Sequence, residues 1–234
     1  MKNALYAFTL LILISACGDG ITENTMTVSG TVKGLKKGTL YLQNIPDSVL
    51  VIVDSLEING DGSFSFQTEI ESPEIFYLYL NKKDNNDLND RITFFGEPGN
   101  ITINTAWNTF DTNATISGSE THEKLKEYRK FMTTVNKRNI ELLQQGYNSE
   151  TPLDSLQLDS LQRKSDRNTQ RGYLFAINFA INNKDSYVAP YIAISEIANA
   201  NVKYLDSINN SLTPEVADSK YGRLLEEHIS KVKN

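Results

Sequence analysis

The chain has 234 residues, a formal net charge of −6 and 39% hydrophobic residues. This acidic balance argues against nucleic acid as a partner, because nucleic acid is bound by basic patches. The only cysteine is Cys17, which excludes a disulfide within the chain and a zinc site built from several cysteines. The length suits one large domain or two small ones.

The chain opens with MKNALYAFTLLILISAC. After Lys2, residues 4–14 are an apolar run that is shorter than the roughly 20 residues needed to span a bilayer and has the length of a signal-peptide core. Residues 14–17 resemble the bacterial lipobox, in which the chain is cut before a cysteine that carries lipid. The alternative is an ordinary cysteine in a signal peptide that is cleaved further on. We expect a lipoprotein signal peptide over residues 1–16 and lipidation of Cys17.

Residues 17–25 are expected to form a polar tether, and residues 26–117 a β-rich module with alternating apolar positions. The turns at 34–38, 59–62 and 97–100 contain glycine with other turn-forming residues and are expected to return the chain to a neighbouring strand. Short strands at even spacing predict an antiparallel β-sandwich-like module. The expected strands are 26–33, 39–43, 47–58, 63–67, 75–80, 91–95, 101–104 and 114–117.

From residue 118 to residue 234 the apolar pattern is helical. The first helix is expected to be capped by Ser119 and to end near residue 146. A second is expected to begin with Thr151 as N-cap and Pro152 as its first residue. Further helices are expected at 186–200, at 204–212 and from 213 to the end. The predicted fold class is therefore α+β, with the β-sandwich-like module at 26–117 followed by an all-helical module at 118–234.

We predict no catalytic, cofactor-binding or metal-binding residue. His122 and His228 are expected to be solvated on helix surfaces, and neither has a second ligand at metal-binding spacing. Glu97 is a lone carboxylate without an identifiable partner. The nucleophile and phosphate-binding motifs of common enzymes are absent from the sequence. These features predict a protein that is not an enzyme.

The acidic segment at residues 84–90 offers oxygen ligands to calcium as an alternative to a solvated loop. An EF-hand loop needs donors at alternate positions and a glycine at the sixth. Leu88 stands at the fifth position and Asn89 at the sixth, so a solvated loop is the better interpretation. Asp61, in the turn at 59–62, is likewise interpreted as a solvated turn residue, with calcium binding as the alternative.

The aromatic run at 76–79 and its neighbours Phe94 and Phe95 are interpreted first as sandwich core. In a strand, Tyr77 and Tyr79 would lie on one face and Phe76 and Leu78 on the other, so one of these two sets is a candidate for an exposed binding surface. Separately, Asp-Ser-aliphatic sequences resemble the acceptor pattern for O-glycosylation of exported proteins, the alternative being chance and helix capping. These five pairs begin at residues 47, 54, 154, 159 and 206.

Several stretches in order resemble an uncharacterised β-rich domain that precedes thioredoxin-like domains of the AhpC/TSA type in envelope lipoproteins of Gram-negative bacteria. They include VSGTVKGLKKGTLYLQ, VDSLEINGDGSFSF, SPEIFYLYL, FFGEPGNITI and ATISGSETHEKLKEY. The helical segments FAINFAINNKDSYVAPYIAI and LTPEVADSKYGRLLEEHISKVK are similar to those that follow in the family. The redox cysteines of full-length relatives belong to a domain that this sequence does not include, so we transfer no redox activity to it.

Together these features predict an exported, lipid-anchored binding or interaction lipoprotein, placed in the outer membrane and facing the periplasm. Its expected partners are the membrane, through lipid on Cys17, and an envelope protein such as a thioredoxin-like protein. The alternative is an accessory subunit that positions substrate for a separate thioredoxin-like oxidoreductase.

Overall fold

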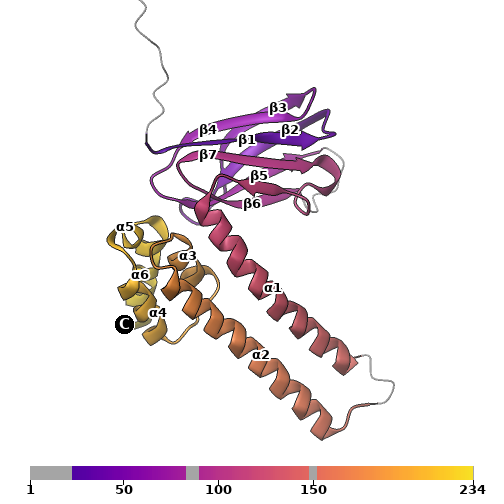
Figure 1. Ribbon diagram of the computed structural model, residues 1–234, viewed down its shortest axis with the longest axis vertical. Helices are drawn as coiled ribbons and strands as arrows, with labels where there is room; N and C mark the ends of the chain where they lie inside the picture. Colours follow the sequence, from indigo (N-terminus) through magenta and orange to yellow (C-terminus); the bar gives the residue numbers. More distant parts are fainter. Residues whose placement is uncertain (1–22, 83–89, 148–151, 234) are drawn as a thin grey trace, which may run out of the picture.

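The computed structural model describes residues 23–82, 90–147 and 152–233, which form a β-sandwich followed by helices (Figure 1). The predicted α+β class is confirmed, and each expected strand is present within a few residues. The last strand ends at Ser117 and the first helix begins at Glu120. The strands are β1 (Thr25–Lys33), β2 (Lys37–Asn44), β3 (Val51–Asn59), β4 (Ser63–Glu69), β5 (Glu74–Asn81), β6 (Arg91–Gly96), β7 (Gly99–Ala106) and β8 (Thr115–Ser117).

The strands form two four-stranded sheets, ordered β4-β1-β7-β8 and β3-β2-β5-β6. Five of the six strand pairs are antiparallel, whereas β1 and β7 pair in parallel. Apolar side chains alternate into one shared core, with Val28, Phe66, Leu42 and Leu78 almost fully buried. The expected alternation of apolar positions is thus present, as the period of two requires.

The expected hairpins at 34–38, 59–62 and 97–100 are wrong in their pairing. Each of these turns carries the chain from one sheet to the other, because β1, β4 and β7 lie in one sheet and β2, β3 and β6 in the other. Gly34 and Gly62 have φ angles of 82° and 80°, a conformation that other residues rarely adopt. Turn residues and alternation specify a reversal and a buried face, but they do not specify the neighbouring strand.

The helices are α1 (Glu120–Tyr147), α2 (Ser155–Asn182), α3 (Val188–Ser195), α4 (Val202–Ser211), α5 (Pro214–Ala217) and α6 (Lys220–Lys233). Ser119 accepts a hydrogen bond from the His122 N–H at 3.0 Å, which confirms it as a cap of α1. The expected start of α2 is wrong: Asp154 is its N-cap and forms a capping box with Gln157. This arrangement satisfies two backbone donors at the start of α2. Thr151, the expected cap, lies outside the described residues.

Two expected helices are shorter than predicted. The helix expected over 186–200 ends at Ser195, and the last one is divided into α5 and α6. Pro214 begins α5 after Thr213, as expected. The Ser219 hydroxyl donates to the Val216 carbonyl at 2.6 Å and accepts from the Gly222 N–H at 3.3 Å, so it satisfies backbone groups at the break.

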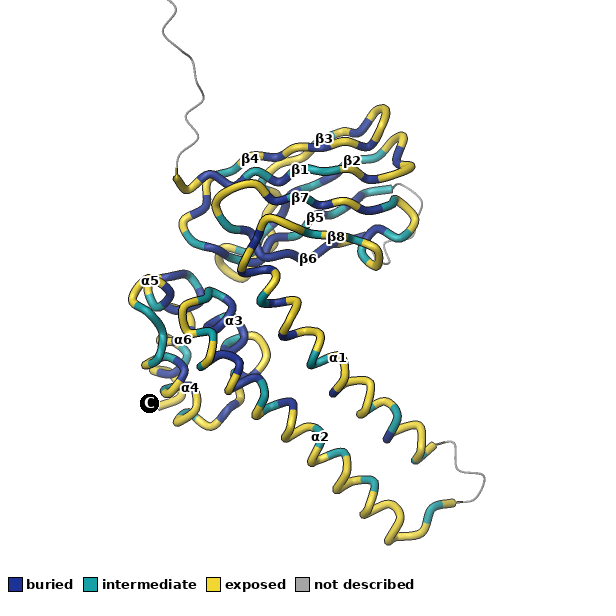
Figure 2. The backbone as a smooth tube through the Cα atoms, viewed as in Figure 1, coloured by how far each residue is buried: buried dark blue, intermediate teal, exposed yellow. Residues whose placement is uncertain are grey.

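Helices α3 to α6 pack beside one end of the sandwich, while α1 and α2 extend away from it as a long antiparallel arm (Figure 1). Buried residues concentrate where the arm joins the body, and its far end is largely exposed (Figure 2). The helical core contains Leu125 and Phe179 together with two residues of the sheet, Ile75 and Phe95. Among the described residues, no helix is both long enough and apolar enough to cross a membrane.

Candidate functional site

The junction between sheet and helices is fixed by side chains that complete the backbone hydrogen bonding of the sheet. β6 is an edge strand, and its Phe95 N–H donates to Nδ1 of His122 at 3.3 Å. The Ile75 N–H of β5 donates to the Tyr221 hydroxyl at 3.1 Å, just beyond the point where β2 stops pairing with β5. Lys220 also forms an ion pair with Glu74. Backbone donors that would otherwise be buried without a partner are thereby satisfied.

These contacts correct the expectation that the two histidines are solvated. His122 is only 7% exposed, and desolvation lowers its pKa to about 4. It is therefore neutral at pH 7, as acceptance of a hydrogen bond at Nδ1 requires. His228 is half-buried, with Nε2 lying 2.9 Å from the Ala198 carbonyl oxygen. Both imidazoles are used in packing and hydrogen bonding.

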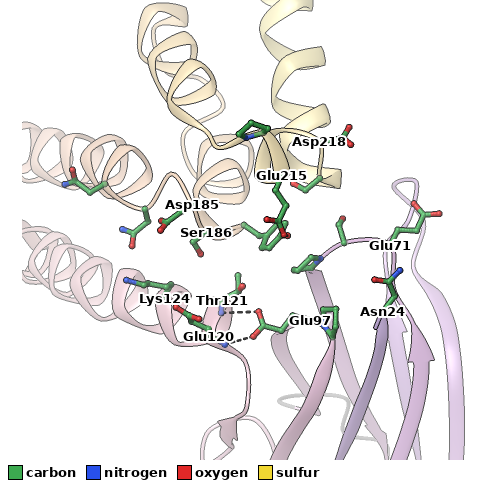
Figure 3. A pocket seen from close by; sticks show the side chains of 18 residues that line it. Asn24, Glu71, Glu97, Glu120, Thr121, Lys124, Asp185, Ser186, Glu215 and Asp218 are labelled. Atoms are coloured by element: carbon green, nitrogen blue, oxygen red, sulfur yellow. Dashed lines mark hydrogen bonds between the residues drawn. The ribbon is translucent and has the colours of Figure 1, made fainter. Parts of the chain in front are cut away.

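A polar cleft of about 980 Å³ lies at this junction, between the loops of the sandwich and helices α1, α2 and α5 (Figure 3). Glu97 accepts hydrogen bonds from the Glu120 N–H at 2.5 Å and the Thr121 N–H at 3.2 Å, so it stabilises the start of α1. Glu215 accepts a hydrogen bond from the Tyr187 hydroxyl at 2.7 Å. Burial and this bond raise the pKa of Tyr187 to about 12.

The cleft is strongly acidic. Lys124 is the one basic residue among those that line it. Within the described parts of the chain, no group of three or more histidine, cysteine, aspartate or glutamate residues is arranged to hold a metal ion. The carboxylates lining the cleft are those of Glu71, Glu97, Glu120, Asp185, Glu215 and Asp218.

A second cleft, of about 540 Å³, is lined by tyrosines, and we call it the tyrosine cleft. Tyr77 of β5 lines it together with Tyr191 of α3 and Tyr221 of α6. Tyr191 and Tyr221 pack edge to face, with ring centroids 5.1 Å apart. Burial raises the pKa of both phenols. The rest of the lining is Ile45, Pro46, Asp47, Ser48, Ile75, Ile194, Ser195, Lys220 and Leu224.

The tyrosine cleft continues onto the outer face of the sheet β3-β2-β5-β6. Tyr41 and Tyr79 are opposite each other on β2 and β5 and stack with their centroids 5.9 Å apart. The Arg91 guanidinium lies 5.4 Å from the Tyr77 ring and 5.6 Å from the Tyr79 ring, within cation–π range. These four residues form what we call the tyrosine face. Tyr41, Tyr77 and Tyr79 are half-buried and Arg91 is exposed.

The alternation of the aromatic run at residues 76–79 therefore separates two environments. Phe76 and Leu78 lie in the sandwich core, whereas Tyr77 and Tyr79 lie on the opposite face. The predicted division of this strand into two faces is thus correct. The contributions of Tyr191 and Tyr221 were missed, because nothing in their local sequence indicates that α3 and α6 pack against this sheet.

An exposed apolar stretch follows the loop that lines the tyrosine cleft. Val49, Leu50, Val51 and Ile52 are 66%, 40%, 41% and 55% exposed. Val51 and Ile52 are the first residues of β3, which is one of the two edge strands of the same sheet. Contiguous exposed apolar residues on a soluble domain are typical of interaction sites.

The remaining sequence candidates lie elsewhere or outside the described residues. Cys17, with the expected signal peptide, falls outside them, as does most of the acidic segment at 84–90. Asp90, at the end of that segment, is buried and paired with Lys82. Asp61 accepts a hydrogen bond from the Ser63 N–H at 3.0 Å and so has a role in its turn.

The five Asp-Ser-aliphatic sequences all lie in the described parts of the chain. The serine of each pair is exposed, which modification would require. Asp154, the first residue of one pair, also has the capping role given above as the alternative. O-glycosylation at these positions stays a prediction.

Comparison with known proteins identifies the β-rich part of the chain. Residues 26–125 match the family model described as a domain of unknown function, DUF4369. The expected resemblance to an uncharacterised β-rich domain is thereby confirmed over the sandwich and the first residues of α1. No curated protein and no solved structure matches the chain. The resemblance of the later helical segments stays a prediction.

Proposed function

We propose that the protein is a lipid-anchored binding protein of the cell envelope that holds a partner protein and performs no chemistry of its own. The observation that carries this proposal is the tyrosine face, which continues into the tyrosine cleft beside the exposed stretch from Val49 to Ile52. Tyrosine and arginine are enriched at protein interfaces and dominate their binding energy.

The chemistry of the junction favours binding over catalysis. The phenols of the tyrosine cleft have raised pKa values, which suits stacking and hydrogen bonding more than proton transfer at neutral pH. The His122 imidazole accepts a backbone hydrogen bond. These groups are satisfied within the fold, while the rings and guanidinium of the tyrosine face present planar surfaces to a partner.

The proposed anchor is lipid on Cys17, which would place the domain at the periplasmic side of the outer membrane. Support for it comes from the sequence around that cysteine. Metabolic labelling with palmitate is expected to mark the wild-type protein and not a Cys17→Ala variant, and membrane fractionation should place the wild type with the outer membrane. Equal labelling of both proteins would contradict lipidation at this residue.

The binding proposal is tested by affinity capture of the full chain from detergent-solubilised envelopes. A Tyr79→Ala/Arg91→Ala variant is expected to lose a partner that the wild type retains. The matched control is Thr102→Ala/Asn104→Ala, which changes the outer face of the other sheet. If the captured partner is a thioredoxin-like protein, the accessory role in a redox reaction becomes the favoured form of the proposal. If all three proteins capture the same partners in the same amounts, the proposal that the tyrosine face binds a partner is contradicted.

A further inference from the structure

The α1–α2 arm carries a basic groove that lies apart from the tyrosine face. It has a volume of about 640 Å³ and is formed by residues of both helices. Of the residues that the structure describes, no aspartate or glutamate lines it, although the chain as a whole is acidic. The residues that line it are Thr134, Arg138, Lys164, Arg167, Asn168 and Arg171.

The polar uncharged residues of the groove are already used within the arm. The Thr134 hydroxyl donates to the Phe131 carbonyl at 2.7 Å. The Asn168 amide donates to the Val135 carbonyl and to Asn139 Oδ1, both at 2.8 Å. The Thr134 bond lies within α1, and the two Asn168 bonds join α2 to α1. Both side chains are thus already engaged, which leaves the cations to recognise a ligand.

Within the described parts of the chain, three of those four cations have no counterion. Arg138 pairs with Glu141 at 3.0 Å, and the Arg171 guanidinium lies 5.1 Å from the Phe131 ring. Among the described residues, Lys164 and Arg167 form no ion pair. By contrast, the neighbouring Arg163 on another side of α2 pairs with Asp159.

The spacing of the cations indicates the form of the ligand. Lys164, Arg167 and Arg171 follow one another at three and four residues, so they lie along one face of α2 over roughly 10 Å. All three are exposed, and single ion pairs in water are weak. A compact anion would reach only part of this row, whereas a helix with carboxylates at the same spacing would meet all of it.

We propose that the basic groove binds an acidic helical segment of a protein partner, which lies along α1 and α2 as a third helix. Its carboxylates repeat at every third or fourth residue and face the cations of both arm helices. This inference goes beyond the proposed function, because the groove is a second surface with a different chemistry from the tyrosine face.

The test uses the full chain in an uncharged detergent and a fluorescent alanine-based peptide of about 20 residues, long enough to form a helix, with glutamates at this spacing. Binding at low salt, followed by anisotropy, is expected to weaken as salt is added. It should weaken by about tenfold or more in a Lys164→Glu/Arg167→Glu variant. The control Arg163→Glu/Lys231→Glu makes the same change in net charge outside the groove and should bind like the wild type.

Two further probes complete the test. A peptide with glutamine in place of glutamate should not bind. Inorganic tripolyphosphate should not displace the glutamate peptide at concentrations comparable to that of the peptide. Absence of saturable peptide binding, equal loss in both double variants, or preferential binding of tripolyphosphate would overturn the proposal. A circular dichroism melt of each variant checks that the arm is folded, and NMR shifts of labelled protein would have to locate the peptide at residues 134–138 and 164–171. Shifts confined to other residues would also overturn it.

Discussion

The two sheets of the sandwich share one core but have very different outer faces. The sheet β4-β1-β7-β8 presents small polar residues outward, such as Thr27, Ser29 and Thr102, whereas the sheet β3-β2-β5-β6 presents tyrosines and Phe95. The core needs only the inward residues, so the outward ones reflect what covers them. Water covers the first face; helices α3 and α6 cover part of the second and leave the tyrosine face beside them.

The largest expected effect on the free energy of unfolding comes from a buried residue of the second face, and a residue of the first face serves as its control. Phe95 is fully buried and packs edge to face on Tyr191 and Tyr221, with centroids 5.7 Å and 6.0 Å away. Phe95→Ala should lower the free energy of unfolding by about 3–5 kcal/mol, and Thr102→Ala should change it by less than about 0.5 kcal/mol. Urea denaturation measures both, and similar losses would mean that the helices do not pack on this sheet.

The next effect is a pH dependence from His122, which joins α1 to the edge of the second sheet. Burial lowers its pKa from 6.5 to about 4 in the folded state, so between these values the unfolded chain binds more protons. The contribution of neutral His122 to the free energy of unfolding is therefore fully present above pH 6.5 and is lost as the pH falls toward 4. It amounts to about 3 kcal/mol.

The matched variant for this pH dependence is His122→Gln, which does not titrate and keeps a hydrogen-bond acceptor. Denaturation curves of wild type and variant should converge or cross between pH 6.5 and pH 4 as the wild type loses stability. Curves that stay parallel throughout this window would show that the folded His122 titrates normally.

A smaller effect is expected at the hydroxyl of Tyr221, the acceptor for the Ile75 N–H. Tyr221→Phe leaves this backbone donor without its partner and should cost about 1–3 kcal/mol. Tyr41→Phe removes a hydroxyl from the half-buried tyrosine face and is expected to cost less. If the two substitutions have the same effect on the denaturation midpoint, the hydrogen bond at Ile75 contributes little.

The smallest stability effect is expected in the acidic cleft, where Glu97 stabilises the first turn of α1. Glu97→Ala should cost about 1 kcal/mol, as the loss of a helix cap does, and Glu97→Gln should retain part of the stabilisation. Glu71→Ala removes a carboxylate from the same cleft without touching a helix start. Thermal melts that rank Glu71→Ala as the more damaging change would contradict the capping role.

Local sequence patterns predicted the buried faces and the elements, but not how the elements meet. Alternation placed Phe76 and Tyr77 on opposite faces of their strand, and the Ser119 cap was evident from its position before an apolar helical repeat. The pairing of β1 with β7 was not predictable, because the connecting turns allow either a hairpin or a crossing between sheets. His122 was misjudged for a related reason: its burial comes from the edge of β6, which is distant in sequence.

The candidate site was predictable in part for the same reasons. Tyr77 and Tyr79 could be placed together on the face opposite Phe76 and Leu78, since the strand period determines this. Which of the two faces is the outer one is decided by the packing of the sheets. Arg91 joins them through the pairing of β5 with β6, and Tyr191 and Tyr221 join them through tertiary packing. Such long-range contacts leave no short-range pattern in the sequence.

Site-specific photocrosslinking in living cells tests the central claim, that the tyrosine face binds a partner, most directly. A photoreactive phenylalanine analogue is placed in the full chain at Tyr79, on the tyrosine face, or at Thr102, on the outer face of the opposite sheet. The account predicts a discrete cross-linked partner from position 79 and none from position 102. The same products from both positions, or no product from position 79, would contradict it.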